Sequence, residues 1–314
     1  MLFSIIIPTY NEEKDILETL NSISKLSYKK YEVIVVDDSN DTTPKIVQDY
    51  KKIKVKLVRP SKRLGRCEAR NIGILESIGD VCIILNADVR LPFDFITNIK
   101  KHYENGYESV TVLSEVENMD NCYARYIGLH HFLKLKNKIF FKRVKTHHNI
   151  WWSEAFSAKK SIIMNTSLFP SGYIMPIVAG EDVVFADELR NKGCKGIFDE
   201  KIIVKHKAPD NMIDYWDVRV GRGVGTPQIR YFINKWSLKR IFFTISMKTI
   251  LRLFKILTIL PMLQYATKLT RLSKSKYFLI ELIKLSYCWL IEQLAFSFGE
   301  FKCFYILLKQ KKYE

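Results

Sequence analysis

Residues 81–90 read VCIILNADVR, and this stretch decides the fold class. Its apolar residues up to Leu85 predict a buried strand, and the run stops at the segment 86–88, before Pro92. A carboxylate at the end of a buried strand is unfavourable unless it holds a cation or accepts several hydrogen bonds. Asp88 is therefore either a ligand of a divalent metal or only a turn or helix-capping residue, and the rest of the chain has to decide between the two.

Strands and helices alternate around this stretch. The predicted strands are Leu2–Ile7, Tyr31–Val36 and Val55–Val58, and the predicted helices run from Asn11, as N-cap, to about Ser24, from near Pro44 onward, and over Arg66–Ser77. Such alternation predicts a parallel α/β sheet with right-handed crossovers. Because the carboxyl ends of parallel strands share one edge, Tyr10, Asp38 and Asp88 should converge on one crevice, which favours the ligand-binding role for Asp88.

The sheet pattern continues to about residue 206. Further strand signals lie at 109–114, at 151–158 and, as two short strands, within 197–206, and a helical pattern covers 118–135. Between them, the basic segment 131–148 is either a solvated loop or a flap that meets phosphate or membrane. Glu181 and Asp182 open a predicted amphipathic helix, where acids also suit the positive end of the helix dipole. Strand signals vanish after residue 210, so we expect an α/β domain over 1–210 and a helical region over 211–314.

The chain is strongly basic. Its 50 Lys and Arg outnumber 33 Asp and Glu, which gives a net charge of +17 over 314 residues, and most of the excess falls after Lys207. The implied partner is anionic: nucleic acid, a phospholipid surface or a phosphorylated substrate. The six cysteines form no C-x-x-C pair, which suits reduced thiols better than disulfides or a zinc site. The start, MLFSIII, lacks the features of a signal peptide, and we expect none.

Two apolar helical stretches lie in the basic region. In the first, 237–260, polar residues recur every three or four positions and make one basic stripe; they are Ser237, Arg240, Thr244, Lys248, Arg252 and Lys255. The second, 277–298, is interrupted by charges, so neither stretch reads as a plain spanning helix. An apolar face with a cationic stripe favours a helix lying in the membrane interface. The alternatives are a helical hairpin packed on the rest of the chain or on a second copy, and insertion into the bilayer.

Five motifs follow one another in an order and spacing that resemble the family 2 glycosyltransferases, which have the GT-A fold. They are IIIPTYNEE at 5–13, VIVVDDSNDTT at 33–43, RLGRCEARNIG at 63–73, NADV at 86–89 and GEDVVFADELRNKG at 180–193. The resemblance covers about residues 3–206. It implies a Rossmann-like, mostly parallel central sheet flanked by helices, a nucleotide-diphosphate-sugar donor, and inversion at the anomeric carbon.

The resemblance also implies site residues. Asp182 looks like the catalytic base, with Glu181 beside it, and Asp88 looks like the last Asp of the metal-binding D-x-D motif. Positions similar to the family's donor-binding residues are Pro8, Tyr10, Glu12, Asp37, Asp38, Arg63, Gly65 and Arg70. His206 matches a His that many relatives place near the metal or diphosphate. The sequence departs from the family at Asn86, which we still expect to bind the donor, because its amide oxygen can accept from a ribose hydroxyl. Asn86 brings no charge, so Asp88 should be the main anchor of Mn²⁺ or Mg²⁺.

Three functions compete at this point. The first is an inverting, metal-dependent glycosyltransferase on the cytoplasmic face of the membrane, which acts on a lipid-linked or surface-glycan acceptor. In that case Arg63 or Arg222 can donate to the departing diphosphate, and an acceptor that attacks through a phosphate needs no base. The second is a sugar-phosphate nucleotidyltransferase, which the glycine-free turn PTYNEE disfavours.

The third reading is a non-catalytic basic protein that binds a membrane or RNA through a degenerate transferase domain. RNA recognition usually presents aromatic and basic side chains together on an open sheet or groove. The basic segments of this chain instead lie on apolar helices, so a membrane partner is favoured and no nucleic acid is expected. The C-terminal helices also offer an alternative homo-oligomer face.

Overall fold

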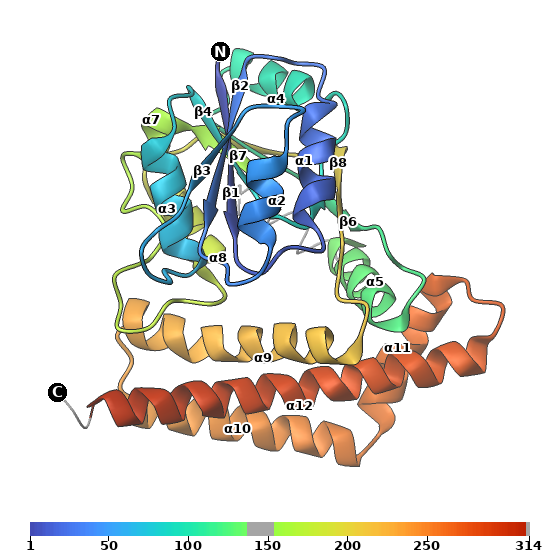
Figure 1. The fold of residues 1–314 in the computed structure, drawn as a ribbon. Helices are drawn as coiled ribbons and strands as arrows, with labels where there is room; N and C mark the ends of the chain where they lie inside the picture. Colours follow the sequence, from blue (N-terminus) through green and yellow to red (C-terminus); the bar gives the residue numbers. More distant parts are fainter. Residues whose placement is uncertain (137–153, 312–314) are drawn as a thin grey trace. The chain divides into compact units, whose positions relative to one another are not determined.

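The computed structural model describes residues 1–136 and 154–311. A mixed eight-stranded sheet has the order β3-β2-β1-β4-β7-β6-β8-β5 (Figure 1). The strands are β1 (Phe3–Thr9), β2 (Tyr31–Asp37), β3 (Val55–Val58), β4 (Val81–Leu85), β5 (Val89–Arg90), β6 (Ser109–Val116), β7 (Ala155–Lys159) and β8 (Gly196–His206). The pairs β1–β2, β1–β4 and β2–β3 are parallel, whereas β4–β7, β6–β7 and β5–β8 are antiparallel. The predicted parallel sheet is thus confirmed for the four strands β3, β2, β1 and β4.

Helices cover both faces of the parallel strands, and this explains their apolar composition. The helices around the sheet are α1 (Ile16–Ser24), α2 (Thr43–Asp49), α3 (Arg66–Glu76), α4 (Phe95–Glu104), α7 (Lys160–Ile163) and α8 (Glu181–Asn191). Alternate residues of β2 point to opposite layers. Val33 and Val35 join the core cluster that includes α1, α2 and α4, whereas Ile34 and Val36 pack with Ala69 of α3. β4 is buried along its whole length, as its sequence predicts.

Two sequence predictions near the sheet are wrong. Asn11 does not cap a helix, because α1 begins only at Ile16 and Asn11 has a left-handed backbone, with φ of 58°. The backbone N–H of Asn11 donates to Ser39 Oγ, and its side-chain Oδ1 accepts from the backbone N–H of Asn40. Asn11 therefore links the turn after β1 to the turn after β2. Asn tolerates this conformation better than most residues. The second error is at 197–206, where one long strand, β8, replaces the two short strands that were predicted.

The contacts divide the chain into two units, which are described separately. Unit 1 comprises 1–115, 154–176 and 181–207, and unit 2 comprises 116–136, 177–180 and 208–311 among the described residues. Unit 2 contains α5 (Cys122–Lys136), α9 (Met212–Gln228), the π-turn η1 (Ile229–Ile233), α10 (Leu238–Leu257), α11 (Leu260–Ser273) and α12 (Phe278–Lys311). Residues 137–153, which hold most of the predicted basic flap, lie outside the described residues.

Close packing of α9 on α12 organises unit 2 (Figure 1). A Cβ on Gly223 of α9 would lie 2.3 Å from the Phe296 carbonyl oxygen, and a Cβ on Gly299 of α12 would lie 2.2 Å from the Val220 carbonyl oxygen. The two helix backbones therefore approach so closely that only glycine fits at either position. The helix predicted at 277–298 is the first part of the much longer α12, and no helix was predicted for α9 or α11.

The predicted helix at 237–260 is confirmed as α10, but its basic stripe is not uniformly exposed. Arg252 instead points to Glu300, whose side chain is fully buried, and also donates to Ser297. A buried carboxylate needs a counter-charge, which accounts for the inward Arg252. The exposed face of α10 is largely apolar. Among the described residues, no helix combines the length and the hydrophobicity that a membrane crossing requires.

Candidate active site

The turns after β1 and β2 are locked to each other at the carboxyl edge of the sheet. Thr9 and Asp37 are register partners in this parallel pair, and the Thr9 hydroxyl donates to Asp37 Oδ1 at 2.8 Å. Ser39 donates to the same oxygen, and the Arg59 guanidinium lies 3.4 Å from the other. Asp37 is completely buried, so its charge is used to hold this edge together. Pro8, one residue before Thr9, is half-buried in β1.

Asp38 organises the loop that precedes α3. Its Oδ2 accepts hydrogen bonds from the backbone N–H groups of Leu64, at 2.9 Å, and Gly65, at 3.1 Å. Gly65 has φ of +82°, and a Cβ there would lie 2.7 Å from Pro176 Cβ, so glycine is required on both counts. The loop places the Arg63 guanidinium 3.8 Å from the centre of the Tyr10 ring. Tyr10, Asp38, Arg63 and Gly65, predicted from separate motifs, are therefore brought together.

A buried ion pair links α3 to the start of α8. Arg70 is 1% exposed, and its Nη1 donates to Glu181 Oε1 at 2.8 Å, while its Nη2 donates to Asn86 Oδ1 at 3.3 Å. Glu181 is also buried, and although burial opposes its charge, Arg66 and Arg70 hold its pKa below the ordinary value. Breaking one partner of such a pair leaves an uncompensated buried charge. Glu181 therefore fixes the position of the residue that follows it.

Asp182 is that residue, and it is half-buried at the first turn of α8. Its Oδ1 accepts from the Val183 N–H at 2.9 Å. Burial, and then the neighbouring negative charge of Glu181, raise the pKa of Asp182 to about 7. A carboxylate with this pKa gains and loses a proton near neutral pH, which is the property of a general base.

Asp88 and His206 meet where β5 pairs with β8. Val89 is the register partner of His206, and the Lys207 N–H donates to the Asp88 carbonyl, so the two side chains are fixed as neighbours. His206 Nε2 lies 3.1 Å from Asp88 Oδ2. Burial opposes the charge of Asp88, but His206 holds its pKa below the ordinary value. Asp88 Oδ1 is buried and has no hydrogen-bond partner.

This unpartnered oxygen fits a divalent metal site. Mg²⁺ and similar hard cations are commonly held by one or two carboxylates together with substrate phosphates, so a rich set of protein ligands is not needed. The described residues contain no group of three or more His, Cys, Asp or Glu suited to a metal. Asp88, with His206 beside it, can supply the ligands that the protein would contribute, and the substrate phosphates would supply the others. Asn86 is engaged by Arg70 instead, which is consistent with its lack of charge.

Arg66 was not selected from the sequence, although it lies within the quoted motif RLGRCEARNIG. Its Nη1 is 3.7 Å from Glu181 Oε1, and the charges of Glu181, Asp182 and Asp88 offset its desolvation and raise its pKa. Glu12 interacts electrostatically with Asp88 and Arg66 as well. Burial, followed by the charge of Asp88, raises the pKa of Glu12 to about 8. Residues from five separate segments therefore form one electrostatic cluster, which we call the edge cluster: Glu12, Arg66, Asp88, Glu181, Asp182 and His206.

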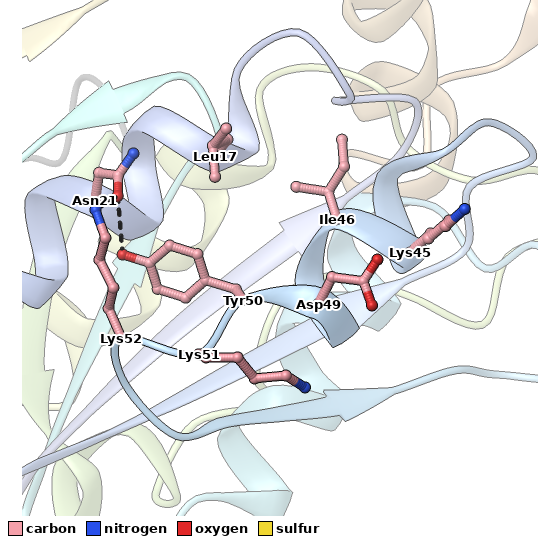
Figure 2. Close-up of a pocket in the computed structure, with 8 residues that line it drawn as sticks. All are labelled: Leu17, Asn21, Lys45, Ile46, Asp49, Tyr50, Lys51 and Lys52. Atoms are coloured by element: carbon pink, nitrogen blue, oxygen red, sulfur yellow. Dashed lines mark hydrogen bonds between the residues drawn. The ribbon is translucent and has the colours of Figure 1, made fainter.

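Two features lie apart from the edge cluster. Arg222, predicted to bind the donor, belongs to unit 2, and its role stays a prediction. A hollow of about 750 Å³ lies between α1 and α2 and is lined by Leu17, Asn21, Lys45, Ile46, Asp49, Tyr50, Lys51 and Lys52 (Figure 2). There the Tyr50 hydroxyl donates to Asn21 Oδ1 at 3.1 Å. Its lining comes from α1, from α2 and from the segment between α2 and β3, and includes none of the predicted site residues.

Comparison with known proteins gives one family. The model for Glycosyl transferase family 2 matches residues 4–164, just over half of the chain. Dolichol-phosphate mannosyltransferase from Pyrococcus furiosus is 37% identical over 109 residues, which is 34% of this chain and 31% of that protein. The chain thus spans about a third of the length of such curated relatives.

Solved structures are similar over a larger part of the chain. Mannosyltransferase PcManGT from Pyrobaculum calidifontis, in complex with GDP-Man and Mn²⁺, has a TM-score of 0.60 at 20% identity and matches 96% of this chain and 86% of its own. TarS from S. aureus, residues 1–349 in complex with UDP-GlcNAc, has a TM-score of 0.55 at 16% identity and matches 96% and 90%. These similarities establish a GT-A-like fold for the mixed sheet and the C-terminal helices.

Proposed function

Because the chain belongs to glycosyl transferase family 2, we propose that it moves a sugar from a nucleotide-diphosphate donor to an acceptor hydroxyl, with inversion at the anomeric carbon. The observation that supports this most directly is the edge cluster, where a base-like carboxylate and a buried, unpartnered carboxylate oxygen share one electrostatic field. Neither a capping role nor a turn role for Asp88 would account for that oxygen.

The nucleotide side of the donor is assigned to the turns after β1 and β2. Asp38 already fixes the backbone of Leu64 and Gly65, and the stacked Arg63–Tyr10 pair offers an aromatic face and a cation at the same place. A guanidinium and a ring suit a flat base and a phosphate. We therefore assign Tyr10, Asp38 and Arg63 to nucleotide recognition, with Pro8 and Asp37 as the rigid support for these turns.

The leaving group is a nucleoside diphosphate, so negative charge grows on its terminal phosphate as the sugar departs. Mn²⁺ or Mg²⁺ held by Asp88, with His206 beside it, would supply electrostatic stabilisation of that charge when bound. Arg66, at the N-terminus of α3, interacts electrostatically with Glu181 and Asp88 and adds a permanent positive charge to the site.

Asp182 is the proposed base. It takes the proton from the acceptor hydroxyl while the oxygen attacks the anomeric carbon on the face opposite the diphosphate. Glu181 keeps Asp182 in place through Arg70 and keeps its pKa near 7 through its own charge. This requires a hydroxyl acceptor, since a phosphate acceptor is already ionised.

The donor can be tested directly. GDP-Man and UDP-GlcNAc are bound in the two structural neighbours, and we propose sugar donors of this kind here. Thermal unfolding should be measured with GDP and UDP, each with and without Mn²⁺, because a ligand that binds the folded state raises Tm by mass action. We expect one nucleotide to raise Tm more with Mn²⁺ than without it. If no nucleoside diphosphate at millimolar concentration raises Tm, the proposed function is wrong.

We also propose that the enzyme works at the cytoplasmic face of an anionic membrane on a lipid-linked or surface-glycan acceptor. From residue 218 to residue 280 the sequence contains no Asp or Glu, whereas Lys and Arg recur throughout. Within this segment Phe243, Met247, Ile250, Phe254 and Leu257, spaced three or four residues apart on α10, are all exposed. We call this row the α10 stripe. An apolar row flanked by cations suits the lipid interface.

A further inference from the structure

Unit 2 contains a buried guanidinium whose hydrogen-bonding groups are not satisfied. Arg219 on α9 is 1% exposed, yet its Nε, Nη1 and Nη2 atoms have no hydrogen-bond partner. The guanidinium lies over the Tyr215 ring, 4.9 Å from its centre, and its Nη1 is 3.3 Å from Glu292 Oε1. Buried donors on a charged group are unfavourable when unpaired, and such groups usually mark a missing polar partner.

Glu292 is only a partial partner for Arg219. Its Oε2 accepts from the Tyr126 hydroxyl at 2.7 Å, so one of its oxygens is already used. Although burial opposes its charge, Arg219, His130 and Arg222 hold the pKa of Glu292 below the ordinary value. At neutral pH one carboxylate is therefore shared between the two guanidinium groups of Arg219 and Arg222.

Further cations surround this pair. Lys134 lies one turn after His130 on α5, and Arg222 lies one turn after Arg219 on α9. Desolvation, and then the charge of Lys134, lower the pKa of His130 to about 4, so His130 is neutral at pH 7. Desolvation followed by the charge of Arg222 also lowers the pKa of Lys134. Lys134, Arg219 and Arg222, which we call the basic cluster, thus repel one another around Glu292.

The basic cluster is accessible on one side. Lys134 is exposed, Arg222 and His130 are half-buried, and Arg219 is at the buried end. The rings of Tyr126 and Tyr215 line that end, 6.2 Å apart, and Tyr265 contacts His130 through its hydroxyl. Lys134 is therefore the solvent-exposed end of the basic cluster, and Arg219 is its buried end.

We propose that the basic cluster of unit 2 binds a phosphate group. The flat fork of a guanidinium matches phosphate oxygens in pairs, and a lysine adds a point charge. A phosphate at the buried end would supply acceptors for the Arg219 donors that Glu292 does not satisfy. Two sources of this chemistry are available, the diphosphate of a nucleotide and the linking phosphate of a lipid-linked acceptor, whose reacting group is a sugar hydroxyl. The proposal concerns unit 2 and does not depend on the edge cluster of unit 1.

Calorimetric titration of the full chain can test this with three probes: inorganic phosphate, n-octyl phosphate below its micelle concentration, and the nucleoside diphosphates GDP and UDP. The variants are Lys134→Gln and Arg222→Gln. Matched controls are Lys268→Gln and Arg271→Gln, because both residues are exposed cations on α11 of the same unit. We expect at least one probe to bind about tenfold more weakly to each cluster variant than to the wild type. The affinity of that probe for each control variant should equal its affinity for the wild type.

The probe that loses affinity identifies the source. Loss for n-octyl phosphate alone indicates the acceptor, and loss for the nucleotide indicates the donor. A Glu292→Gln variant adds a second readout, since it removes the only shared carboxylate named above. Its Tm should fall and then recover on addition of the phosphate probe. Equal affinities of all probes for wild-type and both cluster variants, or a Tm in Glu292→Gln that phosphate does not restore, would overturn the proposal.

Discussion

Asp182 is half-buried beside Glu181, and its pKa of about 7 places its proton loss near neutral pH. The group is a base only when ionised, so kcat/KM should fall as the pH drops through about 7. Asp182→Asn keeps the shape of the side chain but cannot accept the proton. We expect kcat to fall by about 10²- to 10⁴-fold with donor affinity retained, and the acid limb of the pH profile to disappear.

A steady-state transfer assay across pH 5 to 9, beside calorimetric donor binding, measures both effects. The control is Asp187→Asn, which changes a half-exposed carboxylate on the same helix. Full transfer activity in Asp182→Asn would remove Asp182 from the role of base and favour an acceptor that attacks through an ionised group.

Asp88→Asn tests the metal anchor, because it removes the charge and leaves the size of the side chain unchanged. The Mn²⁺-dependent part of the Tm rise with a nucleoside diphosphate should be lost, while any metal-independent part remains. Asp94→Asn, at the exposed start of α4, should behave as wild type. A metal titration that is the same in Asp88→Asn and wild type would place the anchor elsewhere.

At the residue scale, the sequence predicted which turns carry the site residues, but not which of these residues contact one another. Asp38, Asp88 and Asp182 could be predicted because each follows a strand or opens a helix in a recognisable motif. The Arg70–Glu181 pair joins residues 111 positions apart, and the contact of Arg66 with Glu181 spans slightly more of the sequence. Spacing along the chain carries no information about such pairs, which is why Arg66 was missed.

At the scale of elements, β3 and β4 have the predicted boundaries, since short apolar runs bounded by turns identify buried strands. Helix α9 was not predicted, because Gly221, Gly223 and Gly225 weaken any helical pattern when the sequence is read alone. In the folded protein the same glycine is favourable, because the absence of a side chain at Gly223 lets α9 pack closely against α12.

Gly299→Ala tests that contact. The added Cβ would lie 2.2 Å from the Val220 carbonyl oxygen, a backbone atom that cannot rotate away. We expect the free energy of unfolding to fall by about 1 to 3 kcal/mol, as for other overpacked sites. Gly221→Ala is the control, since nothing lies within 4 Å of its Cβ and alanine favours a helix. Denaturant unfolding should give opposite signs for the two variants; a neutral Gly299→Ala would mean that α9 and α12 are farther apart.

For the whole molecule, charge and hydrophobicity are distributed unequally along the chain. The excess of basic residues falls in the C-terminal part, where the sequence already predicted an interfacial helix. The structure changes which residues would meet the lipid. Arg252 turns inward to Glu300, and the α10 stripe is exposed instead, with Phe243 67%, Ile250 60% and Phe254 63% exposed. A helical pattern predicts one apolar face, but only the packing of unit 2 determines which face remains exposed.

The triple variant Phe243→Ser, Ile250→Ser, Phe254→Ser therefore tests the membrane proposal without removing any charge. Each lost side chain removes about 1.5 to 3 kcal/mol of burial on insertion, so the partition coefficient onto anionic vesicles should fall at least about hundredfold. A matched triple variant, Leu75→Ser, Ile78→Ser, Phe93→Ser, changes exposed apolar residues of unit 1 and should bind as wild type. Co-sedimentation with anionic and with neutral vesicles, at low and high salt, separates the apolar contribution from the cationic one. Binding that survives the α10 triple variant would contradict lipid insertion by this helix, and equal binding to neutral vesicles would contradict the role of its cations.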